Sequence, residues 1–283
     1  MNIFSILLAI LIVASWGLNA AIGKMGVSEL PPLLFISIRF SLTALIFIPF
    51  AKVDKKQLIH LFFISLVLNV GHMGGIFVAL KHLSASAFSV LQQLQVPLSM
   101  ILSFLILHEK ISKLQVLGVV ISFTGLFFIF GMPDVTAIGL IALAVGCFAW
   151  GFTQLLFKQA PKFDSCAFMG YSALFCVPFL FLGSLLFESV DYTTVFSNIS
   201  YKVYISLSYQ VILMSIAMLL WQRLIQKNGV AKVTPFNLLQ VVFGILGGMI
   251  LFNESLTFGI VGGTLLITTG IALNIIKCRK MSN

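Results

Sequence analysis

Trp16-Gly17-Leu18-Asn19 runs on to Lys24, and Trp150-Gly151-Phe152-Thr153 runs on to Lys158, 134 residues later. A second set of matches is offset by 145 residues: Gln95, Glu109, Gly118 and Gly125 recur as Gln240, Glu254, Gly263 and Gly270. Both copies lie in long apolar segments. A repeated membrane unit that crosses the bilayer an odd number of times has its two copies inverted, and inverted repeats are common in secondary transporters.

The composition places the chain in a membrane. It has 283 residues, of which 60% are hydrophobic and 9% charged, whereas soluble domains are about 25% charged. A membrane-spanning helix needs about 20 apolar residues, so ten of them would use roughly 200 residues and leave only short loops. We therefore expect an all-α membrane protein, surrounded by the lipid bilayer, with ten transmembrane helices arranged as two inverted five-helix repeats.

Apolar runs and their breaks give the ten expected spans. They are residues 3–23, 32–51, 58–80, 85–107, 114–131, 138–157, 166–187, 203–225, 233–252 and 257–276. The first run is too long for a signal peptide. Residues 1–131 then form the N-terminal repeat, residues 138–276 the C-terminal repeat, and residues 277–283 a basic tail.

The distribution of Lys and Arg predicts that both termini are cytoplasmic. With that orientation thirteen basic residues face the cytoplasm and only three, Lys24, Lys81 and Lys202, face outward. This asymmetry follows the positive-inside rule. It also accounts for the net charge of +9, because the basic residues form no clustered patch typical of a nucleic-acid-binding surface.

Polar side chains inside the expected spans are candidates for solute contact, because such groups are costly in lipid and face the bundle interior or a hydrated cavity. The candidates are Trp16, Asn19, Asn69, His72, Gln92, Gln95, Trp150, Gln154, Asn237 and Gln240. Gln95 and Gln240 occupy matching positions of the two repeats and offer both donors and acceptors. Their alternative role is to hydrogen-bond between helices.

Four residues are expected to act in structure or gating. Arg39 is the only Lys or Arg well inside a span; it could attract a carboxylate or cap helix carbonyls, and we favour a structural or gating role. Pro97 would bend its helix. Glu109 and Glu254 lie at span ends and would organise the turns that follow. His72 is the only group in the middle of a span that titrates near neutral pH.

Other classes of site are not supported by the sequence. The four cysteines lack metal-ligand spacing, so we expect no metal site. Motifs of metalloproteases, serine hydrolases and nucleotide-binding proteins are absent, so we expect neither an enzyme nor a cofactor. The oligomeric state, monomer or homodimer, is left open.

The chain resembles the EamA-type transporters of the drug/metabolite transporter superfamily along nearly its whole length. The resemblance rests on Trp16-Gly17-Leu18-Asn19 with Lys24 and Gly26, Pro31-Pro32, Arg39-Phe40, His108-Glu109-Lys110 and Asn253-Glu254. It implies ten helices with cytoplasmic termini in a bacterial inner membrane, a central cavity and alternating access. The first stretches are especially similar to exporters of amino-acid metabolites.

Together these observations predict a secondary transporter of small polar metabolites, exporting amino acids or derivatives such as cysteine and O-acetylserine. Three alternatives remain. An importer or exchanger of a nucleoside-like metabolite such as S-adenosylmethionine would depend on aromatic stacking. A passive channel would show flux without saturation, and a non-transporting membrane partner would show none.

Overall fold

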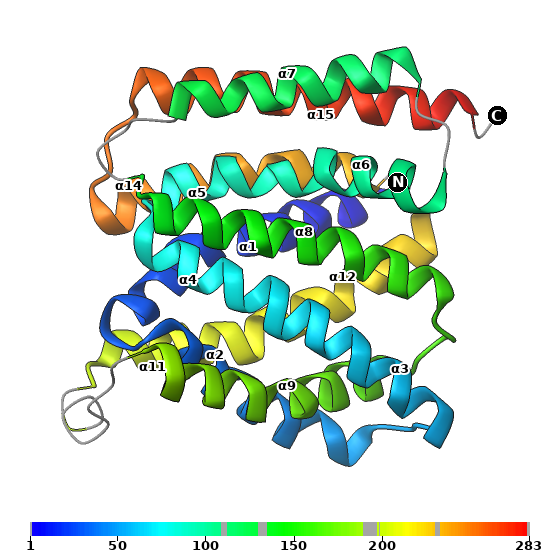
Figure 1. Cartoon of the computed structure of the whole chain (residues 1–283), viewed down its shortest axis with the longest axis vertical. Coiled ribbons are helices and arrows are strands. Elements are labelled where there is room, and N and C mark those ends of the chain that lie inside the picture. The colour runs from blue at the N-terminus through cyan, green and yellow to red at the C-terminus, as the bar shows by residue number, and fades with distance from the viewer. Residues whose placement is uncertain are drawn as a thin grey trace. The chain divides into compact units, whose positions relative to one another are not determined.

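Helices make up nearly all of the computed structural model (Figure 1), which describes residues 2–108, 112–129, 135–188, 197, 199–229 and 233–281. The only β pairing in these ranges is an isolated bridge between Leu83 and Val135. The α-helices are α1 (Ile3–Glu29), α2 (Pro32–Phe47), α3 (Lys55–Ser65), α4 (Gly74–His82), α5 (Ala85–Leu91), α6 (Gln95–Leu107), α7 (Lys113–Ile129), α8 (Ala137–Gln159), α9 (Ser165–Phe187), α11 (Tyr201–Ser208), α12 (Met214–Asn228), α14 (Leu239–Phe252) and α15 (Phe258–Met281).

Seven helical stretches in the described residues are long and apolar enough to cross a membrane. They are Ile3–Glu29, Pro32–Phe50, Lys55–His82, Ala85–Ile106, Ala137–Gln159, Ser165–Phe187 and Tyr201–Asn228. The helices Lys113–Ile129, Phe236–Phe252 and Phe258–Leu273 are apolar but shorter. The first helix continues six residues beyond the predicted boundary at residue 23, and α15 continues into the predicted tail.

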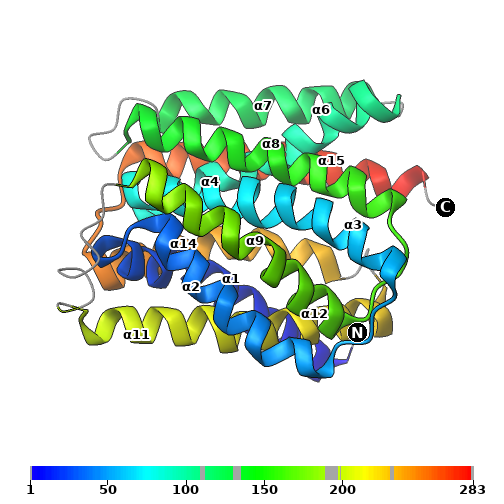
Figure 2. The ribbon, with the colours of Figure 1, turned by 60° about the horizontal axis from the view of Figure 1, so that its bottom comes forward.

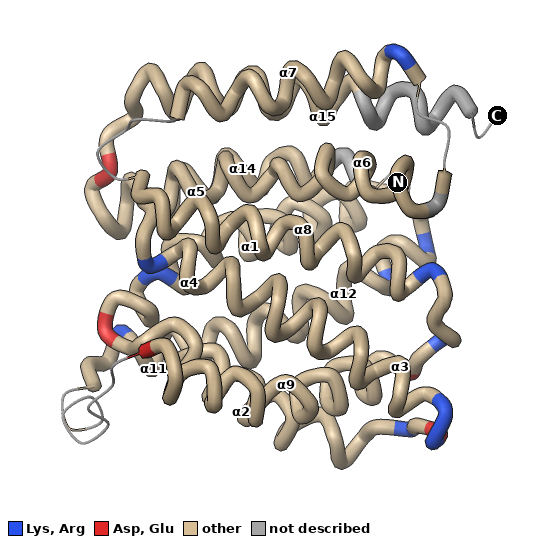
Figure 3. Tube along the Cα trace, viewed as in Figure 1, with Lys and Arg blue, Asp and Glu red and all other residues tan. Residues whose placement is uncertain are grey.

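Most Lys and Arg residues lie at or near helix ends (Figure 3), and two acidic residues, Asp54 and Asp164, are helix N-cap residues. Asp164 accepts a hydrogen bond from the backbone N–H of Ala167 and caps α9. Asp54 is the N-cap residue of α3. A carboxylate at this position stabilises the helix because it interacts with unpaired N–H groups and with the positive end of the helix dipole.

Three glutamates cap helices that are distant in sequence. Glu188 accepts hydrogen bonds from the backbone N–H groups of Leu33 (2.7 Å) and Leu34 (3.2 Å), at the start of α2. Glu29 accepts hydrogen bonds from the N–H (3.3 Å) and hydroxyl (2.7 Å) of Ser200, the N-cap residue of α11. Glu254 caps α5 in the same manner. The carboxylate of each acidic residue in the described ranges therefore contacts a helix N-terminus, and none of these residues lies in the middle of a span.

Glu254 links two segments that are far apart in the sequence. Its carboxylate, which we expected to organise the turn that follows it, accepts hydrogen bonds from the backbone N–H groups of Ala85 (2.7 Å) and Ser86 (2.8 Å). The physical reason is that the first N–H groups of α5 have no partner within their own helix. Glu109, its predicted counterpart, lies outside the described residues.

Contacts divide the chain into two compact units. Unit 1 contains residues 1–21, 82–137 and 216–283, and unit 2 contains residues 22–81 and 138–215. Each unit combines segments from the first and second halves of the sequence.

In unit 1, α7 and α15 lie side by side (Figures 1 and 2). A Cβ atom on Gly270 would collide with the carbonyl oxygen of Gly118, and one on Gly125 would lie 3.1 Å from the carbonyl oxygen of Gly263. Between these contacts the Ser122 hydroxyl donates a hydrogen bond to the carbonyl of Ile267 (3.4 Å). These small residues let the backbones of α7 and α15 approach closely.

In unit 2, α2 packs along α9, and aromatic side chains fill the adjoining core. The rings of Phe35 and Phe77 stack with centroids 5.6 Å apart, and both side chains are almost completely buried. A Cβ on Gly170 would lie 2.9 Å from the backbone nitrogen of Ile48. The backbones of the two helices therefore approach closely at this end of the unit.

Each unit contains paired departures from α-helical geometry. Unit 2 has π-helical segments at Leu66–Met73 and Tyr209–Leu213, and such segments often occur at functional sites. Unit 1 has 3₁₀ segments at Gln92–Leu94 and Thr234–Leu238. The first lies immediately before Pro97, where the missing N–H removes a helical hydrogen bond.

Candidate functional site

The first group of candidate residues belongs to unit 2 and centres on His72. The ring is only 2% exposed, and its Nδ1 lies 2.8 Å from the carbonyl oxygen of Gly146 on α8. Since a carbonyl can only accept a hydrogen bond, Nδ1 carries the proton, and Nε2 of the neutral ring is an acceptor. The contact therefore fixes both the orientation and the tautomer of His72, and Nε2 bonds to none of the described residues.

Trp150 lies directly beside this histidine. The two ring centroids are 5.0 Å apart with an interplanar angle of 44°. Gly146 precedes Trp150 by about one turn of α8, so the same helix supplies the carbonyl and the aromatic ring. Backbone approach makes this possible, because a Cβ on Gly75 would lie 2.6 Å from the carbonyl oxygen of Ala142. The sequence did not predict this pairing of His72 with Trp150.

Asn69 is also held in a defined orientation. Its Nδ2 donates to the carbonyl of Ser172 on α9 (2.9 Å), and the Ser65 hydroxyl donates to the same oxygen (2.5 Å). Because the carbonyl faces the nitrogen of the amide, the Asn69 Oδ1 remains an acceptor. Ser65 and Ser172 were not among the predicted residues. Their role depends on a contact between segments more than a hundred residues apart, which the sequence alone does not show.

Gln154 is the fourth candidate in unit 2. It follows Trp150 by four residues on α8, which places the two on one side of the helix. Its side chain is exposed and forms no hydrogen bond with the described residues. Gln154 is therefore available to a polar group from outside the protein.

The candidate amides of unit 1 lie at the start of α6 and α14. Oε1 of Gln95 and Oδ1 of Asn237 are buried without a hydrogen-bond partner. The side chains of Gln92 and Gln240 also form no hydrogen bond with the described residues. The alternative in which Gln95 and Gln240 join helices by hydrogen bonds is therefore not supported within these ranges.

Gly17 brings α1 against α14. A Cβ on Gly17 would lie 2.5 Å from the carbonyl oxygen of Gln240 and 2.5 Å from the Cβ of Phe243. The glycine next to Trp16 is thus required by packing in this structure. It positions the half-buried Trp16 and Asn19 on the same helix, near the first turns of α14.

Trp16 has an aromatic partner that the sequence did not predict. Its ring meets that of Trp221 on α12 edge to face, with centroids 4.8 Å apart and an angle of 61°. Trp221 belongs to a buried cluster with Ile12, Val13 and other apolar residues. The available signal was that Trp221 is one of only three tryptophans in the chain and lies in an expected span.

Arg39 lies in unit 2 with unusual neighbours for a cation. Nη1 is 3.8 Å from the sulfur of Met73, and the guanidinium lies 5.0 Å and 5.8 Å from the ring centroids of Phe40 and Phe77. Its Nε is buried without a hydrogen-bond partner. Among the described residues the guanidinium bonds to neither a carboxylate nor a carbonyl, so it does not cap helix carbonyls there.

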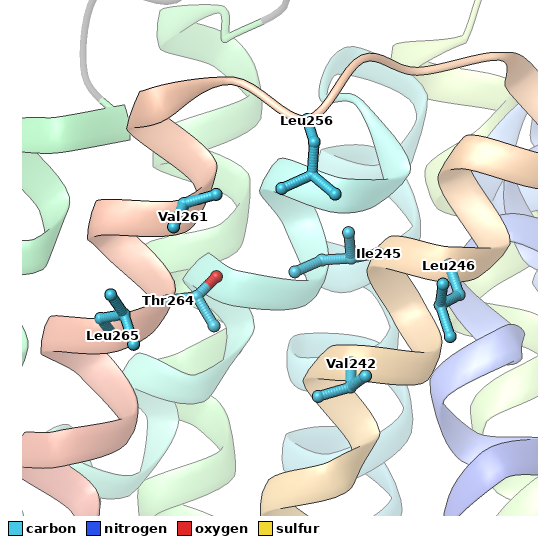
Figure 4. A pocket seen from close by; sticks show the side chains of 7 residues that line it. All are labelled: Val242, Ile245, Leu246, Leu256, Val261, Thr264 and Leu265. Carbon is cyan, nitrogen blue, oxygen red and sulfur yellow. The ribbon is translucent and has the colours of Figure 1, made fainter.

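An apolar pocket of about 240 Å³ lies between α14 and α15 (Figure 4). Its lining residues are Val242, Ile245, Leu246, Leu256, Val261, Thr264 and Leu265. The Thr264 hydroxyl donates to the carbonyl of Ile260 (2.6 Å) and is thus already bonded. This pocket offers a polar solute no free donor.

The described residues contain no group of three His, Cys, Asp or Glu side chains that could hold a metal ion. None of Cys147, Cys166 and Cys176 forms a disulfide.

Comparison with known proteins identifies the family. The sequence profile of the EamA-like transporter family matches residues 3–131 and again residues 137–276. The chain is 28% identical to a Salmonella typhimurium protein and 25% identical to an Escherichia coli protein, each named "Probable amino-acid metabolite efflux pump". Both matches cover 96% of this chain and 95% of the relative.

Two further likenesses extend over almost the whole chain. The Bacillus subtilis "Uncharacterized transporter YvbV" is 26% identical, with 95% of this chain and 90% of that protein covered. A protein of known crystal structure shares the fold, with a TM-score of 0.60 and 17% identity over 100% of both chains. Because the family profile accounts for nearly all residues, this membrane protein belongs to the EamA-like transporter family.

Proposed function

We propose that this transporter exports small polar metabolites, amino acids or derivatives of the cysteine and O-acetylserine type, by alternating access. The observation that carries the proposal is the near full-length similarity to two relatives named as amino-acid metabolite efflux pumps. The side chains fit such a solute, because uncommitted amide and imidazole acceptors can receive hydrogen bonds from an ammonium or hydroxyl group.

The proposed architecture is a pair of inverted five-helix repeats, residues 1–131 and 138–276, with both termini in the cytoplasm and the protein in a bacterial inner membrane. The double match to the family profile supports the repeat. The glycine contacts support its inversion, because Gly118 contacts Gly270 and Gly125 contacts Gly263. The 145-residue offset relates Gly118 to Gly263 and Gly125 to Gly270, so it converts each contact into the other. Such reciprocal contacts are typical of a two-fold axis.

We assign solute contact to two sets of residues, one in each unit. In unit 2 the set is Asn69, His72, Trp150 and Gln154. In unit 1 it is Trp16, Asn19, Gln92, Gln95, Asn237 and Gln240. Trp16 and Trp150 would act as rigid apolar walls, and the amides as hydrogen-bonding groups. Pro97 and Glu254 would have structural roles.

None of the described carboxylates is a candidate for coupling transport to an ion gradient from within a span, because all acidic side chains in the described residues lie at helix N-termini. His72 is then the titratable residue best placed to respond to pH. If transport instead exchanges one solute for another, no titratable side chain is needed for the coupling.

The decisive experiment is counterflow in proteoliposomes. Purified protein would be assayed with O-acetyl-L-serine, L-cysteine and S-adenosylmethionine, with and without a pH gradient. We expect saturable counterflow of the amino acids. Saturable counterflow of S-adenosylmethionine alone would favour the nucleoside-like alternative, flux without saturation a channel, and no flux would contradict transport of these solutes.

Two sets of substitutions then separate the residue assignments. The double variant Gln95→Ala and Gln240→Ala should raise KM for an amino acid about 10-fold or more, as expected for lost hydrogen bonds of about 1 kcal/mol each. If instead Trp16→Ala or Trp150→Ala is much more damaging, aromatic contact dominates. Unchanged kinetics of the double variant would remove the two glutamines from the solute site.

A further inference from the structure

Arg39 presents a charge without a described counter-charge. It lies on α2 seven residues after Pro32, about 10 Å along the helix at a rise of about 1.5 Å per residue. Ionised side chains at such positions are costly and usually pair with another group. The described carboxylates cannot serve, since each already lies at a helix N-terminus.

The immediate neighbours of the guanidinium orient it without neutralising it. Phe40 and Phe77 attract it through their ring faces, and Met73 contributes a weak sulfur acceptor. The orphaned Nε is a buried donor, and an unsatisfied buried donor is unfavourable unless a ligand pairs with it. A planar guanidinium with free donors matches the two oxygens of a carboxylate.

Polar groups of unit 2 adjoin this cation. Met73, which contacts Arg39, follows Asn69 by four residues in the same π-helical segment. Asn69 is held by the Ser172 carbonyl and keeps its Oδ1 as an acceptor. The unit thus has a guanidinium donor and a hydrogen-bond acceptor on neighbouring helices. The guanidinium also contacts two aromatic rings and the Met73 sulfur, and it interacts electrostatically with the Cys176 thiol.

We propose that Arg39 binds the carboxylate of the transported solute and thereby selects amino acids that carry a free carboxyl group. The inference rests on the proposed function and names the substrate group that unit 2 recognises. It replaces the structural or gating role that the sequence favoured for Arg39, because the guanidinium caps no described carbonyl and pairs with no described carboxylate.

The test compares two competitors that differ only in the charged group, L-serine and L-serinamide. Each is added at increasing concentration against counterflow of labelled O-acetyl-L-serine in proteoliposomes. The wild type should be inhibited at about 10-fold or more lower concentration by L-serine, in keeping with the strength of charge-assisted hydrogen bonds. Arg39→Gln should reduce this ratio to near one, and Arg39→Lys should retain part of it.

Ser41→Ala is the matched control, because Ser41 lies on the same helix and its hydroxyl bonds only to the backbone carbonyl of Ser37. It should keep the wild-type ratio within about 2-fold, because the change leaves the guanidinium and its neighbours in place. If Arg39→Gln does not fold, two other measurements test the proposal. Arg39→Lys should show a ratio between one and the wild-type value. The melting temperature of the wild-type protein should rise more with L-serine than with L-serinamide.

The outcomes separate the two proposals. Equal inhibition of the wild type by both competitors, or an unchanged ratio in Arg39→Gln, overturns carboxylate binding by Arg39 while leaving amino-acid transport intact. Absence of saturable amino-acid counterflow in the wild type overturns the proposed function and this inference with it.

Discussion

His108 and Asn253, 145 residues apart, each end a helix in the left-handed conformation, with φ of 53° and 52°. They are the only described non-glycine residues with positive φ. His108 closes α6 and Asn253 closes α14, and both side chains are exposed. Residues of different chemistry thus adopt the same strained backbone at matching places in the proposed repeats, so this conformation belongs to the architecture.

The left-handed conformation predicts opposite effects for two substitutions of Asn253. Asn253→Gly should leave stability unchanged or raise it, because glycine adopts this conformation without a Cβ clash. Asn253→Val should destabilise the protein by about 1–2 kcal/mol. Thermal unfolding in detergent measures both, and His108→Gly and His108→Val should repeat the pattern. Equal melting temperatures for Gly and Val would contradict the assigned conformation.

Gly17→Ala should disturb the contact of α1 with α14. Its methyl group would collide with the carbonyl oxygen of Gln240, and overpacking of this kind costs about 1–3 kcal/mol. Gly74→Ala is the control, since its Cβ would find only ordinary contacts at 3.7 Å and beyond; it should stabilise by about 0.5–1 kcal/mol. Thermal unfolding and counterflow of both variants check this, and equal tolerance would refute the close approach.

The sequence predicted features that depend on local composition. The apolar runs gave the helices within a few residues in most places, because a span must be apolar for about 20 residues. The glycines at positions 118, 125, 263 and 270 recur at the 145-residue offset, and the structure places them where α7 and α15 approach closely, since only small residues allow backbones to approach. The repeated motifs led to the family that the profile match then showed.

Features that depend on distant partners were not predictable from one sequence. Nothing near Glu254 indicates that its carboxylate caps a helix beginning 169 residues earlier. The pairing of Trp16 with Trp221 and of His72 with Gly146 also depends on tertiary packing. The π-helical segments have no residue signature comparable with proline, so they too appeared only in the structure.

Glu254→Gln should weaken the cap of α5. The two carboxylate oxygens each accept one backbone N–H, whereas an amide would turn its NH₂ group toward one of these donors. Loss of one charge-assisted hydrogen bond and of the dipole interaction should cost about 1–3 kcal/mol. Glu29→Gln is the matched control, because Glu29 is exposed and its interaction with Ser200 is screened by solvent. A larger loss of melting temperature for Glu29→Gln would contradict this ranking.

His72 offers a test that separates folding from transport. In Asn the amide nitrogen can occupy the place of Nδ1 and keep the hydrogen bond to the Gly146 carbonyl, which measures 2.8 Å in the structure. In Gln the amide reaches the place of Nε2 and does not form the hydrogen bond to that carbonyl.

We expect the free energy of unfolding of His72→Asn to lie within about 1 kcal/mol of the wild-type value, and we expect this variant to lose most amino-acid counterflow. His72→Gln should be less stable and should transport better than His72→Asn at temperatures where it remains folded. If His72→Asn transports at the wild-type rate, Nε2 contacts no solute, and the residue has only the structural contacts with Gly146 and Trp150.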